Sequence, residues 1–465
     1  MTSLPVSENL NDLPRAPGPR GEAGTTARFS PNPLESLPQL QRAYGDVVDF
    51  GGETPSYLLS DPALIEFVHV QTGRLFDKGY TGSDAAMQPL FGNGLVVSEG
   101  DFWLRQRRMV QPAFHRDRIQ GYGQVMVEYA ERLTRGWQDG EARDAHADMM
   151  HVTLEIILKT LFGAQADDRA HAFGQAMDEM LGSLAELYRA TPESGPDIQA
   201  RYLDALERID TFVAGVIAER RQGRGQGAGQ DQANPDQVNP DRGDLLSMLL
   251  LAQDDEQRGM TEQQLLDEAK NLILAGHETT SNTLSWTWLL LARYPEVEAR
   301  LHAELDAVLT GGRAPTVEDL PQLNYTRMVI SEAMRILPPV WSVGRRARQD
   351  MNLGGYFIPA GAMLSMSQWV VQRDERWFPQ PLEFRPERWA DGLEKTLPKY
   401  AYFPFGGGPR VCIGENFARM EAVLLLASIA RRFRVLVQRP DDTELEPSVT
   451  LRPRRGLPVV LEARR

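Results

Sequence analysis

Cysteine is almost absent from this chain, because Cys412 is the only one among 465 residues. No intramolecular disulfide can form, and no zinc site built from several cysteines is available. A single thiol in a chain of this length is an inert core residue, a catalytic group or a metal ligand. The residues around Cys412 decide between these three roles.

Long apolar runs are also lacking. The longest runs, such as 423–427, fall far short of the ~20 apolar residues that a membrane-spanning helix needs. Seven prolines interrupt residues 1–38, so neither a signal peptide nor a transit helix fits there. We therefore expect a cytoplasmic protein with no membrane span.

Positive charge is in deficit. The chain has 50 Lys and Arg against 64 Asp and Glu, a formal net charge of −14, which argues against a nucleic-acid partner. Hydrophobic residues make up 42% and charged residues 25%, so there is ample apolar material for a large globular core.

One segment is too polar to fold. Residues 222–243 are almost free of apolar side chains and contain a tandem pentapeptide, DQANP followed by DQVNP. Such a segment cannot bury enough surface to offset the entropy of ordering it. We expect a disordered loop inside a single domain of residues 1–465, with a proline-rich arm at 1–30.

Most of the chain has helical periodicity. Apolar residues at helical spacing predict helices at 62–71, 101–114, 117–138, 147–163, 166–189, 197–221, 243–252, 261–292, 294–309, 325–336 and 414–431. Strand patterns are few: 46–50 with 56–60 and 355–358 with 363–367 as two hairpins, then 449–451 and 457–461. The pattern predicts a mainly α fold with a small antiparallel β region.

The lone cysteine lies in a glycine-rich stretch, FPFGGGPRVCIG at 403–414, just before a predicted helix. The positive potential of a helix N-terminus stabilises a thiolate and makes it a competent metal ligand. Glycines at 406, 407, 408 and 414 would let the backbone approach a flat cofactor closely. Arg410 could pair with a cofactor carboxylate.

An inert buried thiol is the alternative, but the spacing argues against it. The pattern of Phe405, Gly408, Arg410, Cys412 and Gly414 has a chance of roughly 10⁻⁴ of occurring somewhere in this chain. It resembles the haem-binding signature of the cytochromes P450, the haem-thiolate monooxygenases. The resemblance implies that these five residues bind haem b, with Cys412 on the iron, inside the triangular, α-rich prism of that family.

A second match implies a structural cluster. Glu332-x-x-Arg335 resembles the family's ExxR pair, which lies on one helix face. The segment FRPERW at 384–389 resembles the one whose arginine, here Arg388, completes a buried Glu-Arg-Arg cluster. By that likeness the three residues are structural and not catalytic.

A third match, AGHETT at 275–280, lies within the helix predicted at 261–292. Ala275, Glu278 and Thr279 share one helix face, while His277 points away. A glycine in mid-helix is costly, so we interpret Gly276 as a functional interruption. The resemblance implies that Glu278 and Thr279 deliver protons for dioxygen activation, and that Ala275 leaves space above the iron.

The remaining matches concern haem propionates and substrate. Trp103-x-x-x-Arg107 resembles the family's helix contact to a propionate, and Arg345 matches its other propionate arginine, although Arg346 and Arg348 compete for that role. A surface arginine run stays an alternative for each. The positions that resemble a substrate pocket are all apolar, although each valine could equally be core: Ala275, Val340, Trp341, Val343 and Val449.

The resemblance thus implies insertion of one oxygen atom from dioxygen into a C–H bond of a hydrophobic substrate of the fatty acid, terpenoid, carotenoid or steroid class. Electrons would come from a separate ferredoxin or flavodoxin with its reductase, and we expect a monomer. A peroxide-driven peroxygenase and a non-catalytic haem sensor are the alternatives. The Glu278–Thr279 pair favours the monooxygenase, because family members that use peroxide generally lack it.

Two further expectations concern basic residues. The net charge is negative, yet arginines gather in the segments predicted on the thiolate side, where an acidic electron donor would dock: Arg105, Arg108, Arg116, Arg118 and Arg419. None of the seven histidines has a partner at metal-ligand spacing. We expect His115, His277 and the others to be surface residues or satisfied core residues.

Overall fold

The computed structural model describes residues 10–19, 32–51, 54–79, 87–163, 168–187, 194–221, 244–253 and 258–464. The chain divides into two compact units, each assembled from three segments. Unit 1 comprises Met1–Gly79, Ser331–Cys412 and Leu445–Arg452, and unit 2 comprises Tyr80–Ile330, Ile413–Glu444 and Pro453–Arg465. The predicted loop at 222–243, and the predicted arm apart from residues 10–19, lie outside the described residues.

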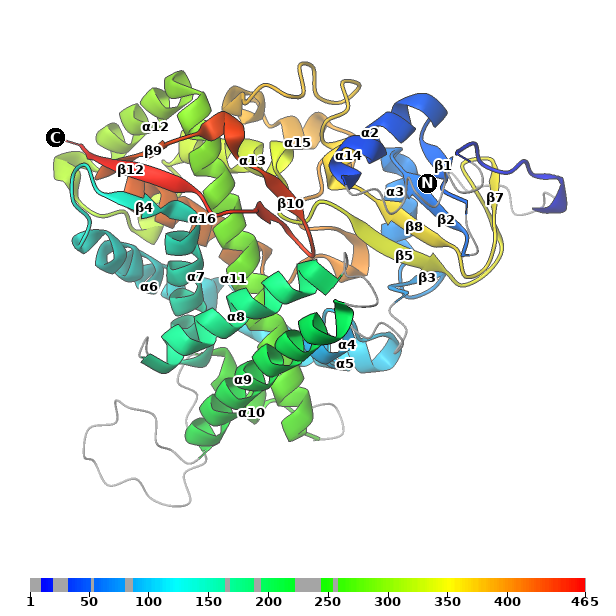
Figure 1. Ribbon diagram of the computed structural model, residues 1–465, viewed down its shortest axis with the longest axis horizontal. Coiled ribbons are helices and arrows are strands. Elements are labelled where there is room, and N and C mark those ends of the chain that lie inside the picture. Colours follow the sequence, from blue (N-terminus) through cyan, green and yellow to red (C-terminus); the bar gives the residue numbers. More distant parts are fainter. Residues whose placement is uncertain are drawn as a thin grey trace. The chain divides into compact units, whose positions relative to one another are not determined.

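Unit 1 contains a five-stranded sheet in the order β1-β2-β8-β5-β3 (Figure 1). Its strands are β1 (Val47–Asp49), β2 (Ser56–Leu59), β3 (Phe76–Asp77), β5 (Val343–Ala347) and β8 (Met363–Met366). β1 and β2 are antiparallel, with Val48 opposite Leu58, so the first predicted hairpin is confirmed. β2 and β8 are parallel, and the other pairs of this sheet are antiparallel.

The second predicted hairpin is wrong. β7 (Tyr356–Ile358) pairs with β6 (Met351–Leu353), and β8 joins the large sheet between β2 and β5. Gly354 and Gly355 form the actual turn, at φ values of 64° and 85° that favour glycine. The sequence pattern pointed to the next turn along the chain, because Pro359 to Gly361 carries an equally strong turn signal.

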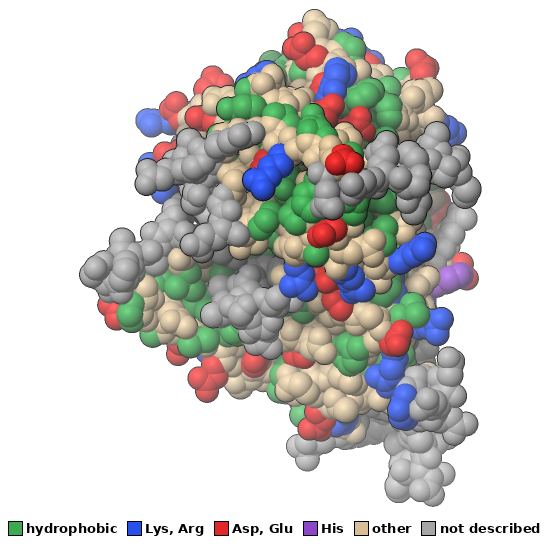
Figure 2. Space-filling view, turned by 90° about the vertical axis from the view of Figure 1, so that its right-hand side faces the viewer, with side chains coloured by type: hydrophobic (Ala, Val, Ile, Leu, Met, Phe, Trp, Pro, Cys, Tyr) green, Lys and Arg blue, Asp and Glu red, His purple; other side chains and the backbone are tan. Residues whose placement is uncertain are grey.

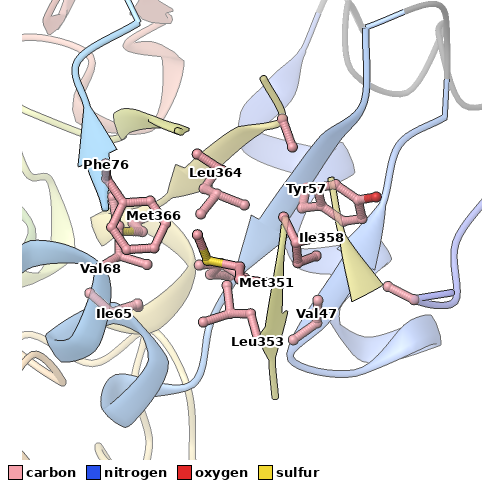
Figure 3. Close-up of a cluster of buried hydrophobic side chains, with 14 of the residues drawn as sticks. Val47, Tyr57, Ile65, Val68, Phe76, Met351, Leu353, Ile358, Leu364 and Met366 are labelled. Atoms are coloured by element: carbon pink, nitrogen blue, oxygen red, sulfur yellow. The ribbon is translucent and has the colours of Figure 1, made fainter. Parts of the chain in front are cut away.

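The core of unit 1 lies between this sheet and helix α3 (Pro62–Val70) (Figure 3). Asp61 caps α3 by accepting from the backbone N–H groups of Ala63 and Leu64. Ile65 and Val68 of α3 are fully buried in the same cluster as strand residues of the sheet. The last turn of α3 is therefore held firmly in unit 1.

The other elements of unit 1 are short. They are η1 (Leu10–Asp12), α2 (Pro33–Tyr44), α14 (Gln368–Val371), η5 (Pro386–Trp389), α15 (Leu393–Thr396), η6 (Gly408–Arg410) and the pair β10 (Leu445–Pro447) and β11 (Leu451–Pro453). Helix α13 (Asn324–Ile336) begins in unit 2 and ends in unit 1. On the face drawn in Figure 2, acidic and basic side chains are interspersed among hydrophobic ones and are not grouped by sign.

Unit 2 is predominantly helical. Its helices are α4 (Met87–Phe91), α5 (Gly100–Val110), η2 (Gln111–Phe114), α6 (Arg116–Arg135), α7 (Ala145–Phe162), α8 (Asp168–Leu187), α9 (Gly195–Arg221), α10 (Leu245–Leu251), α11 (Glu262–Arg293), α12 (Pro295–Val308), η3 (Thr310–Gly312), η4 (Val317–Asp319), α16 (Glu415–Ala430) and η7 (Pro440–Asp442). A small antiparallel sheet has the order β4 (Ala142–Asp144), β12 (Pro458–Ala463), β9 (Phe433–Val437).

The longest helix, α11, begins at a capping box. The Thr261 hydroxyl accepts from the Gln264 backbone N–H, and the Gln264 side chain accepts from that of Thr261. None of the helices in the described ranges is long and apolar enough to cross a membrane. The predicted fold class, mainly α with small antiparallel sheets, is confirmed.

Candidate active site

The glycine-rich loop of unit 1 ends at Cys412, which is exposed and forms no disulfide. The Cys412 backbone N–H donates to the Phe405 carbonyl at 3.0 Å, and that of Val411 donates to the Gly408 carbonyl at 3.1 Å. These bonds fold the loop back on itself around η6. Gly414, the last residue of the motif, is the N-cap of α16.

The glycines of this loop are needed for contacts within the protein. A Cβ atom on Gly408 would lie 2.1 Å from the His69 carbonyl oxygen, and one on Gly407 would lie 2.3 Å from the Tyr400 ring. Gly408 also has a φ of 63°, which any other residue adopts with strain. The sequence analysis explained these glycines by a cofactor alone and missed the packing of α3 and Tyr400 against them.

The three candidate propionate arginines lie in strand β5 or just after it, and they differ in their contacts. Arg345 and Arg346 point to opposite faces because side chains alternate along a strand. Arg346 and Arg348 both pair with the Asp77 carboxylate, at 3.0 and 3.3 Å. Arg345 is only 6% exposed, and its guanidinium donates to the Thr72 hydroxyl and the Gly344 carbonyl. The geometry favours Arg345 over its neighbours as the cofactor-binding arginine.

The Glu332, Arg335 and Arg388 side chains form one buried cluster in unit 1. Arg335 donates to both Glu332 oxygens at 2.8 Å, and Arg388 donates to one of them at 3.1 Å. Trp389 Nε1 and the Arg385 backbone N–H also donate to this carboxylate. The structure thus brings together the three residues that the sequence predicted as a structural cluster.

The unit 1 residues predicted to line a pocket are half-buried, and none belongs to the buried core. Trp341 Nε1 donates to the Ser448 carbonyl at 2.9 Å, and the Leu451 backbone N–H donates to the Pro339 carbonyl at 2.8 Å. The structure therefore brings the chain around Val340 to Val343 next to the chain around Val449. Val343 packs against the hydrophobic core cluster of unit 1, so core packing stays an alternative for it.

Helix α11 carries the acid–alcohol pair of unit 2. Ala275 is exposed and Thr279 is half-buried, with its hydroxyl donating to the Ala275 carbonyl at 2.7 Å. Glu278 is only 3% exposed. The three residues were predicted to share one helix face, but Glu278 is buried whereas Ala275 is exposed.

Gly276 does not interrupt α11, which is continuous from Glu262 to Arg293, so that expectation is wrong. A Cβ atom on Gly276 would lie 2.7 Å from Ile157 Cδ1 of α7. The Thr153 hydroxyl of α7 also donates to the His277 carbonyl at 3.2 Å. Close packing of two helices therefore explains this glycine.

Trp103 and Arg107 lie one turn apart on α5 and are both half-buried. The α-helix ends at Val110, earlier than predicted, because Pro112 has no N–H to continue it and η2 follows. Two arginines of the predicted docking surface already have partners: Arg105 donates to the Arg258 and Gly259 carbonyls, and Arg419 pairs with Glu415 at 2.9 Å.

Sequence reasoning missed two buried titratable residues. In unit 2, Glu421 of α16 is fully buried, and neither of its oxygens has a hydrogen-bond partner among the described residues. Burial raises the pKa of this carboxyl well above its usual range, and the nearby Thr280 hydroxyl opposes the shift. A glutamate within the apolar stretch of the helix predicted at 414–431 was the available signal.

In unit 1, His69 is also fully buried, with neither ring nitrogen hydrogen-bonded to the described residues. The expectation that every histidine is exposed or satisfied is therefore wrong. Burial and then the Arg345 guanidinium lower the pKa of His69 to about 3, while the Gly407 backbone opposes the shift. His277 is 1% exposed, and burial lowers its pKa to about 3 as well.

The donor set of unit 1 fits a haem held by one protein ligand. An exposed cysteine ends the loop, and Arg345 and Arg410 are cations that could pair with a cofactor carboxylate. The site thus has the features of a haem-thiolate protein. Comparison with known proteins tests this assignment independently.

The chain matches the cytochrome P450 family model over residues 18–459. It is 38% identical to cyclooctatin synthase of Streptomyces melanosporofaciens over 95% of each chain. It is 36% identical to cyclooctat-9-en-7-ol 5-monooxygenase of the same species, over 90% of this chain and 89% of the relative. It is also 32% identical to pentalenene oxygenase of Streptomyces avermitilis over 93% of each chain.

Among solved structures, the crystal structure of the cytochrome P450DA heme domain superimposes with a TM-score of 0.84 at 28% identity, covering 97% of this chain and 98% of that one. The chain therefore belongs to the cytochrome P450 family. It is a monooxygenase, an oxidoreductase whose cofactor is haem b.

Proposed function

We propose that this cytochrome P450 inserts one oxygen atom from dioxygen into a C–H bond of a terpenoid. The observation that carries the proposal is the similarity, along nearly the whole chain, to oxygenases named for cyclooctat-9-en-7-ol and pentalenene, which are a terpenoid alcohol and a terpenoid hydrocarbon. The half-buried apolar positions at Val340, Trp341, Val343 and Val449, together with the exposed Ala275, suit such a substrate. The similarity to these two oxygenases is the reason to propose a terpenoid, because apolar positions alone would also allow a fatty acid, a carotenoid or a steroid.

Cys412 is the proposed iron ligand, and Arg345, Arg410, Trp103 and Arg107 are the proposed partners of the haem carboxylates. Haem, when bound, supplies the oxygen-activating chemistry, and a thiolate ligand favours cleavage of the O–O bond. The loop supports this role for Cys412, because its backbone hydrogen bonds and its glycines leave the thiol exposed. Phe405, Gly408 and Gly414 shape the loop around it.

Glu278 and Thr279 are the proposed proton carriers. The reaction consumes dioxygen, two electrons and two protons for each alcohol formed and releases one water. Thr279 is half-buried, with a hydroxyl bonded to the backbone one turn earlier, and Glu278 is an acid buried beside it on α11. A buried acid next to a partly accessible alcohol is a path by which protons can reach the reacting oxygen.

We infer that the electrons come from a separate ferredoxin or flavodoxin with its reductase, and that the chain acts as a cytoplasmic monomer. The two units are proposed to work as one domain, because each is assembled from three interleaved segments and neither is a continuous stretch. Arg108 is exposed on α5 and is a proposed contact for an acidic donor. Its replacement by Glu should slow the first electron transfer at low salt.

The ligand assignment is tested by the spectrum of the reduced carbon monoxide adduct. Wild-type protein should show the far-red-shifted Soret band that is typical of thiolate ligation, and Cys412→Ser should lose it. Retention of the band in Cys412→Ser would refute the assigned ligand. A wild-type protein loaded with haem but lacking the band would refute the proposed function as a whole.

The proton carriers are tested by the product formed per NAD(P)H consumed with a working redox partner. Thr279→Ala should bind haem and substrate normally but divert electrons to hydrogen peroxide. Thr287→Ala is the matched control, because the Thr287 hydroxyl also donates to a carbonyl one turn earlier, at 2.7 Å. Equal coupling in both variants would contradict the role of Thr279.

The substrate class is tested by substrate-induced shifts of the Soret band. Terpenoid alcohols and hydrocarbons should shift the band at lower concentration than fatty acids or steroids of similar size. The reverse order would remove the terpenoid assignment and leave the monooxygenase intact.

A further inference from the structure

Two stacked rings of unit 1 pack against the glycines that precede Cys412. The rings of His69 and Tyr400 are 5.1 Å apart between centroids and only 19° from parallel. Phe403 meets the His69 ring edge-on at 5.9 Å. We call the His69–Tyr400 pair the platform.

The platform packs directly against the glycines of the loop, with no room for a side chain at Gly407 or Gly408. The His69 carbonyl and the Tyr400 ring occupy the space that side chains at positions 408 and 407 would need, and a Cβ atom on Gly406 would lie 3.9 Å from His69 Cε1. Three consecutive glycines therefore rest on two residues from distant parts of the chain. A shift of the Tyr400 ring would open a void beside Gly407, and a shift of the His69 backbone would move Gly408, while the His69 imidazole lies against Gly406 and the Tyr400 ring.

Both residues of the platform carry a free-energy cost in the folded protein. His69 buries two ring nitrogens without a hydrogen bond to the described residues, where an apolar ring would avoid that penalty. Tyr400 has a φ of 64°, in the left-handed region that residues other than glycine rarely adopt. Strain and unsatisfied polar groups of this kind persist where the surrounding structure requires them, which is most often at functional sites.

The platform is also linked to the arginine proposed to bind haem. The Thr72 backbone N–H donates to the His69 carbonyl at 3.3 Å, and the Thr72 hydroxyl accepts from Arg345 Nε at 3.1 Å. The turn that ends α3 therefore contacts the ligand loop through His69 and Arg345 through Thr72. This turn therefore links the position of the ligand loop to that of Arg345.

We propose that His69 and Tyr400 are positioning residues for Cys412, which hold the glycine loop in the conformation that presents the thiolate to haem. This proposal rests on the proposed role of Cys412 as the iron ligand. The platform acts through packing, with a neutral imidazole stacked on a phenol ring. Without the platform, the haem-loaded enzyme should shift, before it unfolds, toward a form in which the thiolate no longer ligates the iron.

The test uses the haem-loaded enzyme in increasing urea, followed by two readouts. The Soret band of the reduced carbon monoxide adduct reports thiolate ligation, and far-ultraviolet circular dichroism reports unfolding. In His69→Ala, the equilibrium between thiolate and non-thiolate adducts should shift about two- to tenfold toward the latter, the range expected for loss of an aromatic pair. His69→Phe keeps a stacked ring and should shift it less.

Ile65→Ala is the matched control. Ile65 is fully buried one turn earlier on α3, in the hydrophobic cluster with the strands of the sheet (Figure 3), and it is not among the atoms nearest to the loop glycines. It should lower the unfolding midpoint while leaving the adduct ratio before unfolding at the wild-type value. Tyr400→Leu removes the same stack from its other side, so it carries the test if His69→Ala does not load haem.

Spectral loss and unfolding that move together by the same amount in the platform variants and in Ile65→Ala would overturn the proposal. That outcome leaves the wild-type thiolate band intact and is therefore distinct from failure of the proposed function, in which wild-type protein has no such band.

Discussion

Two glutamates, one in each unit, are equally buried and have opposite surroundings. Glu332 in unit 1 and Glu421 in unit 2 are both fully buried. Two arginines, a tryptophan N–H and a backbone N–H donate to the Glu332 carboxylate. Glu421 has no hydrogen-bond partner among the described residues, and burial raises the pKa of its carboxyl well above the usual range.

The comparison shows that burial alone does not determine what a carboxyl group does. At Glu332, the attraction of Arg335 and Arg388 compensates for the loss of water, and the anion ties α13 to the η5 segment. At Glu421 burial outweighs the opposing effect of the Thr280 hydroxyl, so the pKa of the carboxyl is raised well above its usual range. The same substitution at the two positions should therefore have opposite effects.

The largest effect is expected at Glu332. Glu332→Met keeps the side-chain volume but leaves Arg335 and Arg388 buried without their anion. The free energy of unfolding should fall by about 3–5 kcal/mol, the loss seen when one partner of a buried ion pair is removed. Urea unfolding measures it, with the exposed Glu375→Met as the control. A loss equal to that of the control would mean that the cluster contributes nothing to stability.

Glu421→Met should have the opposite sign. The substitution removes an unsatisfied polar group and leaves no charge unpaired, so unfolding at pH 7 should require roughly 1–3 kcal/mol more than in wild type. The same urea experiment measures it. Destabilisation comparable to Glu332→Met would show that Glu421 has a partner on which the fold depends.

Glu268 of α11 lies between these two cases, because its carboxyl group accepts a single hydrogen bond. We expect its substitution to change stability least, and in a way that depends on pH. It is fully buried and accepts one bond, from the Leu95 backbone N–H at 3.1 Å. Burial raises its pKa to about 8, with the Leu95 bond opposing the shift and Asp267 adding to it. Because the folded pKa is above the unfolded one, this group's contribution to stability is complete below pH 4.5 and is lost as pH rises toward 8.

Glu268→Gln removes that dependence while keeping an oxygen for the Leu95 N–H. Thermal unfolding should show the two proteins closest near pH 4.5, with the variant increasingly more stable than wild type as pH rises toward 8. Glu262→Gln, the same change of charge at an exposed position of the same helix, controls for altered helix electrostatics. Parallel pH profiles for wild type and Glu268→Gln would rule out titration of Glu268 in this range.

Local signals in the sequence were enough for most helices and for one hairpin. The pattern at 147–163 predicted α7 (Ala145–Phe162), because its apolar periodicity lies within the segment itself, although the helix begins earlier, after the capping Asp144. The β1–β2 hairpin joins strands that are neighbours in sequence. β8 was assigned the wrong partner, because its neighbours β2 and β5 come from distant or unrecognised segments.

The candidate site residues also fall into those that local spacing indicates and those that require the tertiary structure. Cys412, the Glu332–Arg335 pair and the Glu278–Thr279 pair were proposed from spacing, since short motifs keep their residues at fixed separations along the chain. The choice of Arg345 over Arg346 and Arg348 required strand β5, in which alternation and Asp77 separate the three side chains. Gly276 was misinterpreted because its reason, Ile157, lies on another helix.

By itself, the sequence determined the helical fold class, the family and the motif residues, because all of these are encoded in composition, periodicity and short-range spacing. Tertiary structure alone decided which buried groups are compensated and which are not. Glu332, Glu421 and His69 are buried by residues far from them along the chain, and a group's charge and cost depend on those neighbours. Partners in space set the balance between desolvation and attraction, and one-dimensional spacing does not contain them.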